Sequence, residues 1–256
     1  MEYGEVRPDP ALARRVRCIW WMTAPPGGDG PSRAGSEGVL PDGRPELVLN
    51  FGDPFLHHRA AGAPAVTQPR AVLVGQITHP LHLEPSGRIE LLGVRFHASG
   101  LHRLTGLPAD ELVDGWTGLE DGWAGGAELW DRVAHAGTGP IGPGSAEGRT
   151  HRWRIDVLQG LLRRALGNAR GAPEPVGAAE RMIRKTGGSV SMDRVAEVVE
   201  LSPRQLRRRF RTEAGIGPKL LARMVRLQGF IRLAEDRPRE STARLALEAG
   251  YYDQAH

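Results

Sequence analysis

The sequence has a single cysteine, Cys18, among its 256 residues, and only 5% of its residues are aromatic. One cysteine cannot form an intramolecular disulfide, and it cannot supply a four-cysteine zinc site. The sequence also has no run of 18 or more apolar residues, which argues against a membrane-spanning helix. Its first residues lack the apolar stretch of a secretory signal. These absences favour a reduced, cytoplasmic protein with no membrane partner.

Lysine is nearly absent too, since Lys185 and Lys219 are the only lysines among 34 basic residues. A GC-rich genome would explain the abundance of arginine, so the position of the charge is the informative feature. Residues 1–150 hold 13 basic and 18 acidic residues, whereas residues 151–256 hold 21 basic and 12 acidic residues. An acidic first part joined to a basic second part predicts that the second part meets a polyanion.

The first hundred residues contain short apolar runs separated by turn residues. This spacing favours a small antiparallel sheet, sandwich or barrel over an alternating α/β layout. The expected strands cover residues 16–23, 46–51, 71–76, 81–84 and 89–96. The predicted fold class is therefore α+β, with a β-rich domain at 5–114, a helical connector at 115–170 and an all-α domain at 176–256.

The connector contains one clear amphipathic helix at 152–166. Its apolar positions repeat at helical spacing. These positions are Ile155, Leu158, Leu161, Leu162 and Ala165. Two interpretations stay open, because such a face can pack on its own domain or form the seam of a homodimer. The Pro/Gly-rich residues 168–177 are the expected linker between domains.

The basic region begins with two short helices joined by a tight turn. Residues 191–199 have a Ser start signal and apolar residues at helical spacing, and Glu200 and Leu201 follow as the turn. Ser202 then restarts a helix in which Leu206 and Phe210 face inward. The arginines occupy the remaining surface of this second helix. Such an arrangement is typical of a helix-turn-helix.

The same design occurs a second time after a long helix at 218–234. Residues 241–249 predict another short helix, with Gly250 as its turn, Tyr251 facing inward and Asp253 as the next N-cap. The stretch from Ala196 to Ser202 thus has a counterpart between residues 246 and 253. This repetition predicts two groove-reading modules joined by a helical rod.

Residues 191–256 resemble the double helix-turn-helix domain of AraC/XylS-type transcription regulators, and the segments LSPRQLRRRF and GYYDQAH carry the resemblance. The segments LPDGRPELVLNFGDP and VGQITHPLHLEPSGRIELLGVRFHASGLHRLTG are similar to an uncharacterised N-terminal domain often fused to these regulators. The resemblance implies a transcription regulator that binds double-stranded promoter DNA. It also implies an N-terminal domain that senses a small-molecule effector or pairs two subunits, with RNA polymerase as a further partner.

The resemblance also assigns roles to single residues of this sequence. The residues expected to read base edges are Arg204, Arg207, Arg208, Gln254 and His256. Those expected to contact phosphates are Ser202, Arg209, Arg211, Lys219 and Arg226. The long helix is expected to hold the two modules about one DNA turn apart, roughly 34 Å.

The sequence departs from the family pattern in two places. Glu200 occupies a turn position where the family usually has glycine, and a left-handed backbone there costs a non-glycine residue about 1 kcal/mol. The chain also ends at His256, inside the second recognition helix, so we expect a truncated and weakened second module.

A second class of function is a small-molecule-binding or metal-dependent β-barrel enzyme with a basic helical tail. His79, His82 and Glu84 form a conceivable metal set, although surface histidines are the favoured interpretation. Cys18 lies in an apolar run and is expected to be an inert buried thiol. No Gly-x-Ser-x-Gly elbow or phosphate-binding glycine loop is present. The sequence therefore predicts neither catalysis nor a cofactor.

Three tryptophans of the β-rich region could line a pocket, but core packing is the favoured interpretation. They are Trp20, Trp21 and Trp116.

Overall fold

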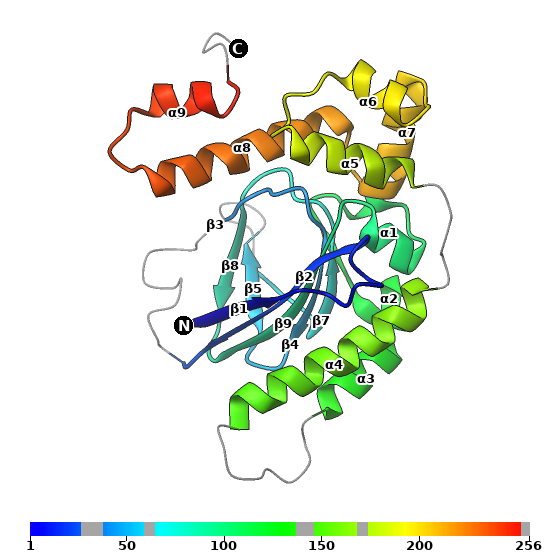
Figure 1. Ribbon diagram of the computed structural model, residues 1–256. Helices are drawn as coiled ribbons and strands as arrows, with labels where there is room; N and C mark the ends of the chain where they lie inside the picture. Colours follow the sequence, from blue (N-terminus) through cyan, green and yellow to red (C-terminus); the bar gives the residue numbers. More distant parts are fainter. Residues whose placement is uncertain (27–37, 59–64, 137–145, 168–173, 252–256) are drawn as a thin grey trace.

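The computed structural model describes residues 1–26, 38–58, 65–136, 146–167 and 174–251 (Figure 1). Its first part contains a six-stranded antiparallel sheet in the order β1-β2-β9-β4-β7-β10. These strands are β1 (Glu2–Val6), β2 (Val16–Ala24), β4 (Glu46–Asn50), β7 (Ala71–Val74), β9 (Ile89–Phe96) and β10 (Trp116–Gly118). A second sheet has the order β3-β8-β5-β6. Its strands are β3 (Gly38–Val39), β5 (Phe55–His58), β6 (Val66–Thr67) and β8 (Leu81–Pro85).

The larger sheet is covered on both faces. Because side chains alternate along a strand, Ile19 and Trp20 of β2 lie on opposite faces. Ile19 belongs to the core shared with the following helices, whereas Trp20 packs with Phe55 of the second sheet. The expected α+β class, with an antiparallel β-rich domain at the N-terminal end, is confirmed.

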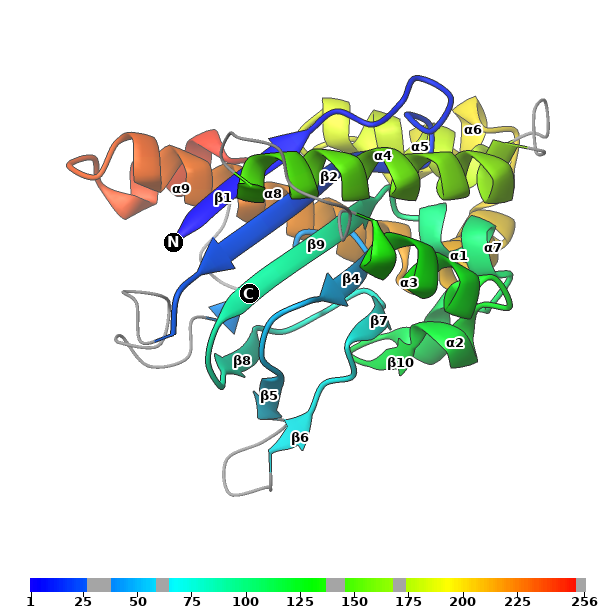
Figure 2. The same ribbon diagram turned by 90° about the horizontal axis from the view of Figure 1, so that it is seen from below.

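The helices within residues 100–167 share a core with one face of this sheet (Figure 2). They are α1 (Gly100–Thr105), the short 3-10 helix η2 (Ala109–Leu112), α2 (Leu119–Gly122), α3 (Gly126–His135) and α4 (Ala146–Gly167). The apolar stripe of α4 is buried against this core through Ile155, Leu158, Leu161 and Leu162. The stripe thus packs on its own domain and is not available as a dimer seam. Ala165 was expected in the stripe and is exposed, because in the last turn the core contact passes to Leu166.

The C-terminal part is helical and lies against one end of the sheets (Figure 1). Its helices are α5 (Pro175–Lys185), α6 (Met192–Val198), α7 (Pro203–Ala214), α8 (Pro218–Asp236) and α9 (Thr242–Glu248). Residues 168–173 of the expected linker lie outside the described residues. Its remaining part is no linker, since Pro175 begins α5 and Val176 is fully buried. Within the described ranges, no helix is both long and apolar enough to cross a bilayer.

Candidate nucleic-acid interface

The first module is built around the turn between α6 and α7. The Ser191 side chain accepts a hydrogen bond from the Arg194 backbone N–H and begins α6. At the start of α7 the Gln205 backbone N–H donates to Ser202 Oγ at 3.2 Å, and the Ser202 backbone N–H donates to Gln205 Oε1 at 2.9 Å. This reciprocal pair is a capping box, so the first residues of α7 fix its start locally.

Three residues at four-residue spacing anchor α7. Leu206, Phe210 and Ala214 are buried, and Phe210 has no exposed surface. They share a core with Val195 and Ala196 of α6. The small Ala196 side chain is buried in the core that the two helices share. The opposite side of α7 is consequently left to solvent.

That outward side of α7 carries its arginines. All five are exposed, and no carboxylate within the described ranges pairs with any of them. They are Arg204, Arg207, Arg208, Arg209 and Arg211. Arg204, Arg208 and Arg211 follow one another at i, i+4 and i+7, which places them on one face of the helix. The only acid of α7, Glu213, pairs instead with Arg103 of α1 at 2.9 Å.

The other residues expected to contact phosphate differ in availability. Ser202 and Lys219 are exposed, although the Ser202 hydroxyl is already part of the helix cap. Arg226 is half-buried, and its Nη1 donates to the Gly188 carbonyl at 2.7 Å. It holds the turn before α6 through this hydrogen bond, and its role as a phosphate contact stays a prediction. Tyr251 was expected to face inward and is instead exposed, with the Arg226 guanidinium 5.9 Å from its ring centroid.

The second module is described only up to its turn. Ser241 caps α9, Leu245 is buried and Gly250 takes the left-handed conformation with φ 88°. Arg237, just after α8, donates to both carboxylate oxygens of Glu248 at 2.9 and 2.7 Å. Those hydrogen bonds lower the pKa of Glu248. Asp253, Gln254 and His256 lie outside the described residues.

The turn of the first module carries backbone strain at Glu200. Its φ is 55°, as the sequence predicts for a non-glycine residue in this turn. The Leu201 N–H reaches back to the Ala196 carbonyl at 3.0 Å, so the left-handed geometry closes α6.

We expect Glu200→Gly to raise the free energy of unfolding by about 1 kcal/mol, because glycine adopts φ above zero without a steric penalty. Glu200→Ala is the matched control, since it removes the carboxylate and keeps the β-carbon. Urea unfolding measures both variants. An equal gain in the free energy of unfolding of both variants would show that the carboxylate, and not the backbone conformation, is destabilising.

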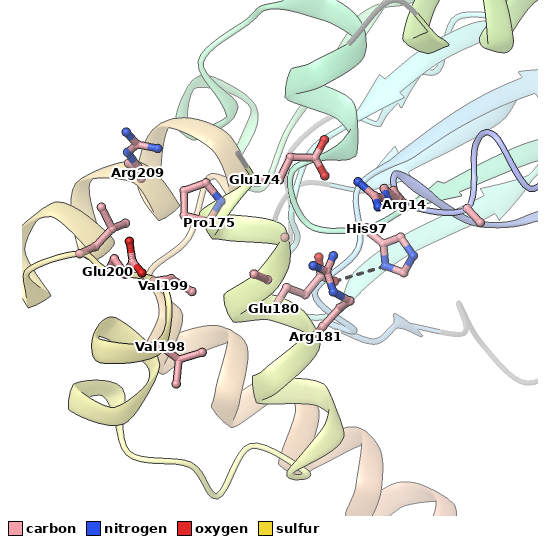
Figure 3. A pocket seen from close by; sticks show the side chains of 14 residues that line it. Arg14, His97, Glu174, Pro175, Glu180, Arg181, Val198, Val199, Glu200 and Arg209 are labelled. Atoms are coloured by element: carbon pink, nitrogen blue, oxygen red, sulfur yellow. Dashed lines mark ion pairs between the residues drawn. The ribbon is translucent and has the colours of Figure 1, made fainter. Parts of the chain in front are cut away.

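A cleft of about 770 Å³ separates this turn from the β-rich domain (Figure 3). Arg14 and His97 line it from the β-rich side, and Glu180 lines it from α5. Glu200 and Arg209 line it from the turn and from α7. The first module thus faces the β-rich domain directly.

Glu180 is the polar centre of the contact between the two parts. Glu180 is 1% exposed, and its side chain accepts hydrogen bonds from the Ala98 backbone N–H at 2.7 Å and from Arg184 Nε at 2.8 Å. Arg44 Nη1 and His97 Nδ1 lie 4.0 and 3.7 Å from Glu180 Oε1. Burial alone would raise the pKa of Glu180, but His97 and Arg184 outweigh it and hold the pKa below its usual range.

Backbone carbonyls of the β-rich domain complete this junction. Arg184 donates from Nη1 and Nη2 to the carbonyls of Asp42 and Gly43, and Gln228 of α8 donates to the Pro41 carbonyl at 2.9 Å. The sequence interpretation did not include Glu180. One signal was present, because Glu180 stands at a core position of α5 between Val176 and Ile183.

The alternative enzyme site gains no support from the described side chains. His79 is mostly exposed and pairs with Asp114 at 3.2 Å. No group of three potential metal ligands occurs within the described ranges. Cys18 is buried, as the sequence predicts, and burial raises the pKa of its thiol to about 11. Such a thiol is protonated at neutral pH and a poor nucleophile.

Two of the three tryptophans line cavities. Trp20 is buried, and Trp21 is partly buried against the core and lines a cavity of about 390 Å³. Trp116 lines a cavity of about 340 Å³ and donates from Nε1 to His57 Nδ1 at 3.3 Å.

A capped turn between two helices, with an unpaired arginine face on the second helix, defines a DNA-binding helix-turn-helix protein. Residues 195–256 match the family described as a helix-turn-helix domain, and residues 4–116 match a domain of unknown function (DUF6597). The chain therefore carries a helix-turn-helix domain behind this β-rich domain.

Among solved structures, the chain is similar to ToxT from Vibrio cholerae. The identity is 8% over 99% of this chain and 91% of that chain, with a TM-score of 0.44. A structure of wild-type ToxT with bound unsaturated fatty acid matches at 8% identity over 85% of this chain and 82% of that chain, with a TM-score of 0.40. No curated protein matches the chain.

Proposed function

We propose that the chain regulates transcription by reading promoter DNA in the major groove with α7. Arg204, Arg207 and Arg208 contact base edges, and Arg209 and Arg211 contact phosphates. The observation that carries this proposal is the exposed arginine face of α7, which no carboxylate of the described ranges neutralises. Ser202 and Lys219 extend the phosphate contacts, and Gln254 and His256 would begin those of the second module.

The physical basis is that a guanidinium group matches two kinds of partner on DNA. Each phosphate that the protein neutralises releases counterions. For each such contact, a tenfold rise in salt concentration lowers the decimal logarithm of the binding constant by about 0.9. A bidentate arginine–guanine pair adds about 1–3 kcal/mol of discrimination between bases. The same face can thus provide both attraction and sequence preference.

The β-rich domain would govern this DNA binding, either by sensing a small-molecule effector or by pairing two subunits. Its direct contact with α5 and α8 through Glu180, Arg184 and Gln228 supports control by the β-rich domain. A homodimer would present two such units to adjacent half-sites of a promoter.

The proposal can be tested by selecting DNA sites from a random library with the full chain and then measuring variants by mobility shift. We expect Arg204→Ala and Arg208→Ala to weaken binding to the selected site by about 5- to 150-fold, which corresponds to 1–3 kcal/mol. Binding to unrelated DNA should fall much less. Arg70→Ala is the matched control, because Arg70 is an exposed arginine on the β-rich domain.

Equal losses of affinity for selected and for unrelated DNA would show that both arginines contact phosphates and not bases. An absence of salt-dependent binding to any DNA would overturn the proposed function.

A further inference from the structure

A second cavity, of about 300 Å³, lies where the β-rich domain meets α5 and α8. Its walls bring together guanidinium groups from both parts of the chain. They are Arg17, Arg44 and Arg95 from the β-rich domain, Arg184 from α5 and Arg232 from α8. Two carboxylates, Glu5 and Asp42, also line it.

Carboxylates neutralise only part of the positive charge that lines this cavity. Arg95 pairs with Glu46 at 2.6 Å and with Glu5 at 3.4 Å, and Arg184 pairs with Glu180. Arg17 and Arg232 are exposed and pair with no carboxylate within the described ranges, although they belong to different domains. Like charges that share a partly enclosed cavity repel one another unless an anion joins them.

Arg44 of the same cavity is affected first by burial and then by the positive charge of Arg184. Burial and the neighbouring Arg184 lower the pKa of its guanidinium to about 10. Glu180 and Asp42 oppose this change without cancelling it. An anion in the cavity would relieve this repulsion.

We propose that this cavity binds a compact polyanion, a phosphate ester or a polycarboxylate with at least two negative charges, between Arg17 and Arg232. Val225 and Cys18 are its only apolar lining residues, so an alkyl chain finds little surface there. A volume of about 300 Å³ is at the small end of ligand sites. Arginine suits such a ligand because its planar donors bind carboxylate and phosphate oxygens in pairs.

The site itself stands independently of the proposed function, and its regulatory effect rests on that function. A ligand that joins Arg17 to Arg232 bridges the β-rich domain and the rod between the two modules. It would therefore fix the orientation of α8, and with it the DNA affinity.

The test uses the full chain and two probes, inorganic pyrophosphate and citrate, in titration calorimetry. We expect one or both to bind, and we expect Arg17→Gln and Arg232→Gln each to weaken that binding at least tenfold. Arg223→Gln is the matched control, because Arg223 is an exposed arginine of α8 that does not line the cavity. Tighter binding of pyrophosphate indicates a phosphate ester, and tighter binding of citrate indicates a polycarboxylate.

The inference is wrong if neither probe binds at millimolar concentration or if Arg223→Gln weakens binding as much as the cavity variants do. It is also wrong if octanoate, a single charge on an alkyl chain, competes as well as the polyanions. Mobility shifts with and without the bound probe separate the two proposals. Calorimetric binding without any DNA binding would end the proposed function and leave the anion site intact.

Discussion

Replacing Phe210 with alanine is expected to lower the free energy of unfolding of the helical domain by about 3–5 kcal/mol. Phe210 has no exposed surface and lies at the centre of the core that joins α6 to α7. Its removal leaves a cavity in the core between α6 and α7, and the smaller Leu206 and Ala214 side chains remain as the buried anchors of α7. Because the orientation of α7 presents the arginine face, binding to selected DNA should be lost together with stability.

The sequence offers a clean way to measure this loss. All six tryptophans lie within the first 153 residues, so their fluorescence reports the part of the chain before α5, whereas far-ultraviolet circular dichroism reports the helices of both parts. Phe210→Ala should move the dichroism transition to lower urea more than the fluorescence transition. Phe230→Ala is the control, since Phe230 of α8 is only half-buried and its loss should cost much less. Equal costs for the two variants would contradict a core role specific to Phe210.

The helix-turn-helix could be predicted from sequence because its signals are local. The serine caps, the small Ala196 and the strained Glu200 all lie within twelve residues, and each acts on its own neighbours. The prediction that Tyr251 faces inward was wrong because the signal for it is not local. Only tertiary contacts decide whether a single aromatic side chain after a turn is buried or exposed.

The β-rich domain was predictable in class but not in detail. Five strand positions were expected close to where they occur, because four of them are short and mostly apolar runs and residues 81–84 alternate apolar and polar side chains. The strand β1 was not expected, since its sequence EYGEV is mostly polar and it pairs at the sheet edge with β2 alone. The strand β10 has three residues and forms only by pairing with β7. Such strands form only against a neighbouring strand, and the local sequence pattern does not identify that neighbour.

The contact between the two parts was the least predictable feature. Glu180 and the Ala98 N–H that it binds are 82 residues apart. Charge along the chain located the DNA-facing part, yet it did not indicate which arginines would be neutralised inside the protein. Arg184 and Arg204 look alike in the sequence, whereas Arg184 is half-buried beside Glu180 and Arg204 faces solvent.

This contact leads to the second large expected effect. Glu180→Ala should lower the free energy of unfolding by about 3–5 kcal/mol, because the variant leaves the guanidinium groups of Arg184 and Arg44 partly buried without their shared carboxylate. The Ala98 N–H also loses its acceptor. Since these groups belong to both parts of the chain, fluorescence and dichroism should detect the loss as two separated transitions.

Glu197→Ala is the matched control, because Glu197 pairs with Arg194 at 2.7 Å on an exposed surface and such pairs contribute about 1 kcal/mol or less. The pH dependence supplies a second test. The pKa of Glu180 lies below the ordinary glutamate value of about 4.3, so its stabilisation is complete above that pH and is lost as the pH falls through the lower, folded pKa. The difference between wild type and Glu180→Ala should therefore shrink as the pH falls below about 4. A difference that stays unchanged down to pH 2 would mean that the charge of Glu180 does not hold the two parts together.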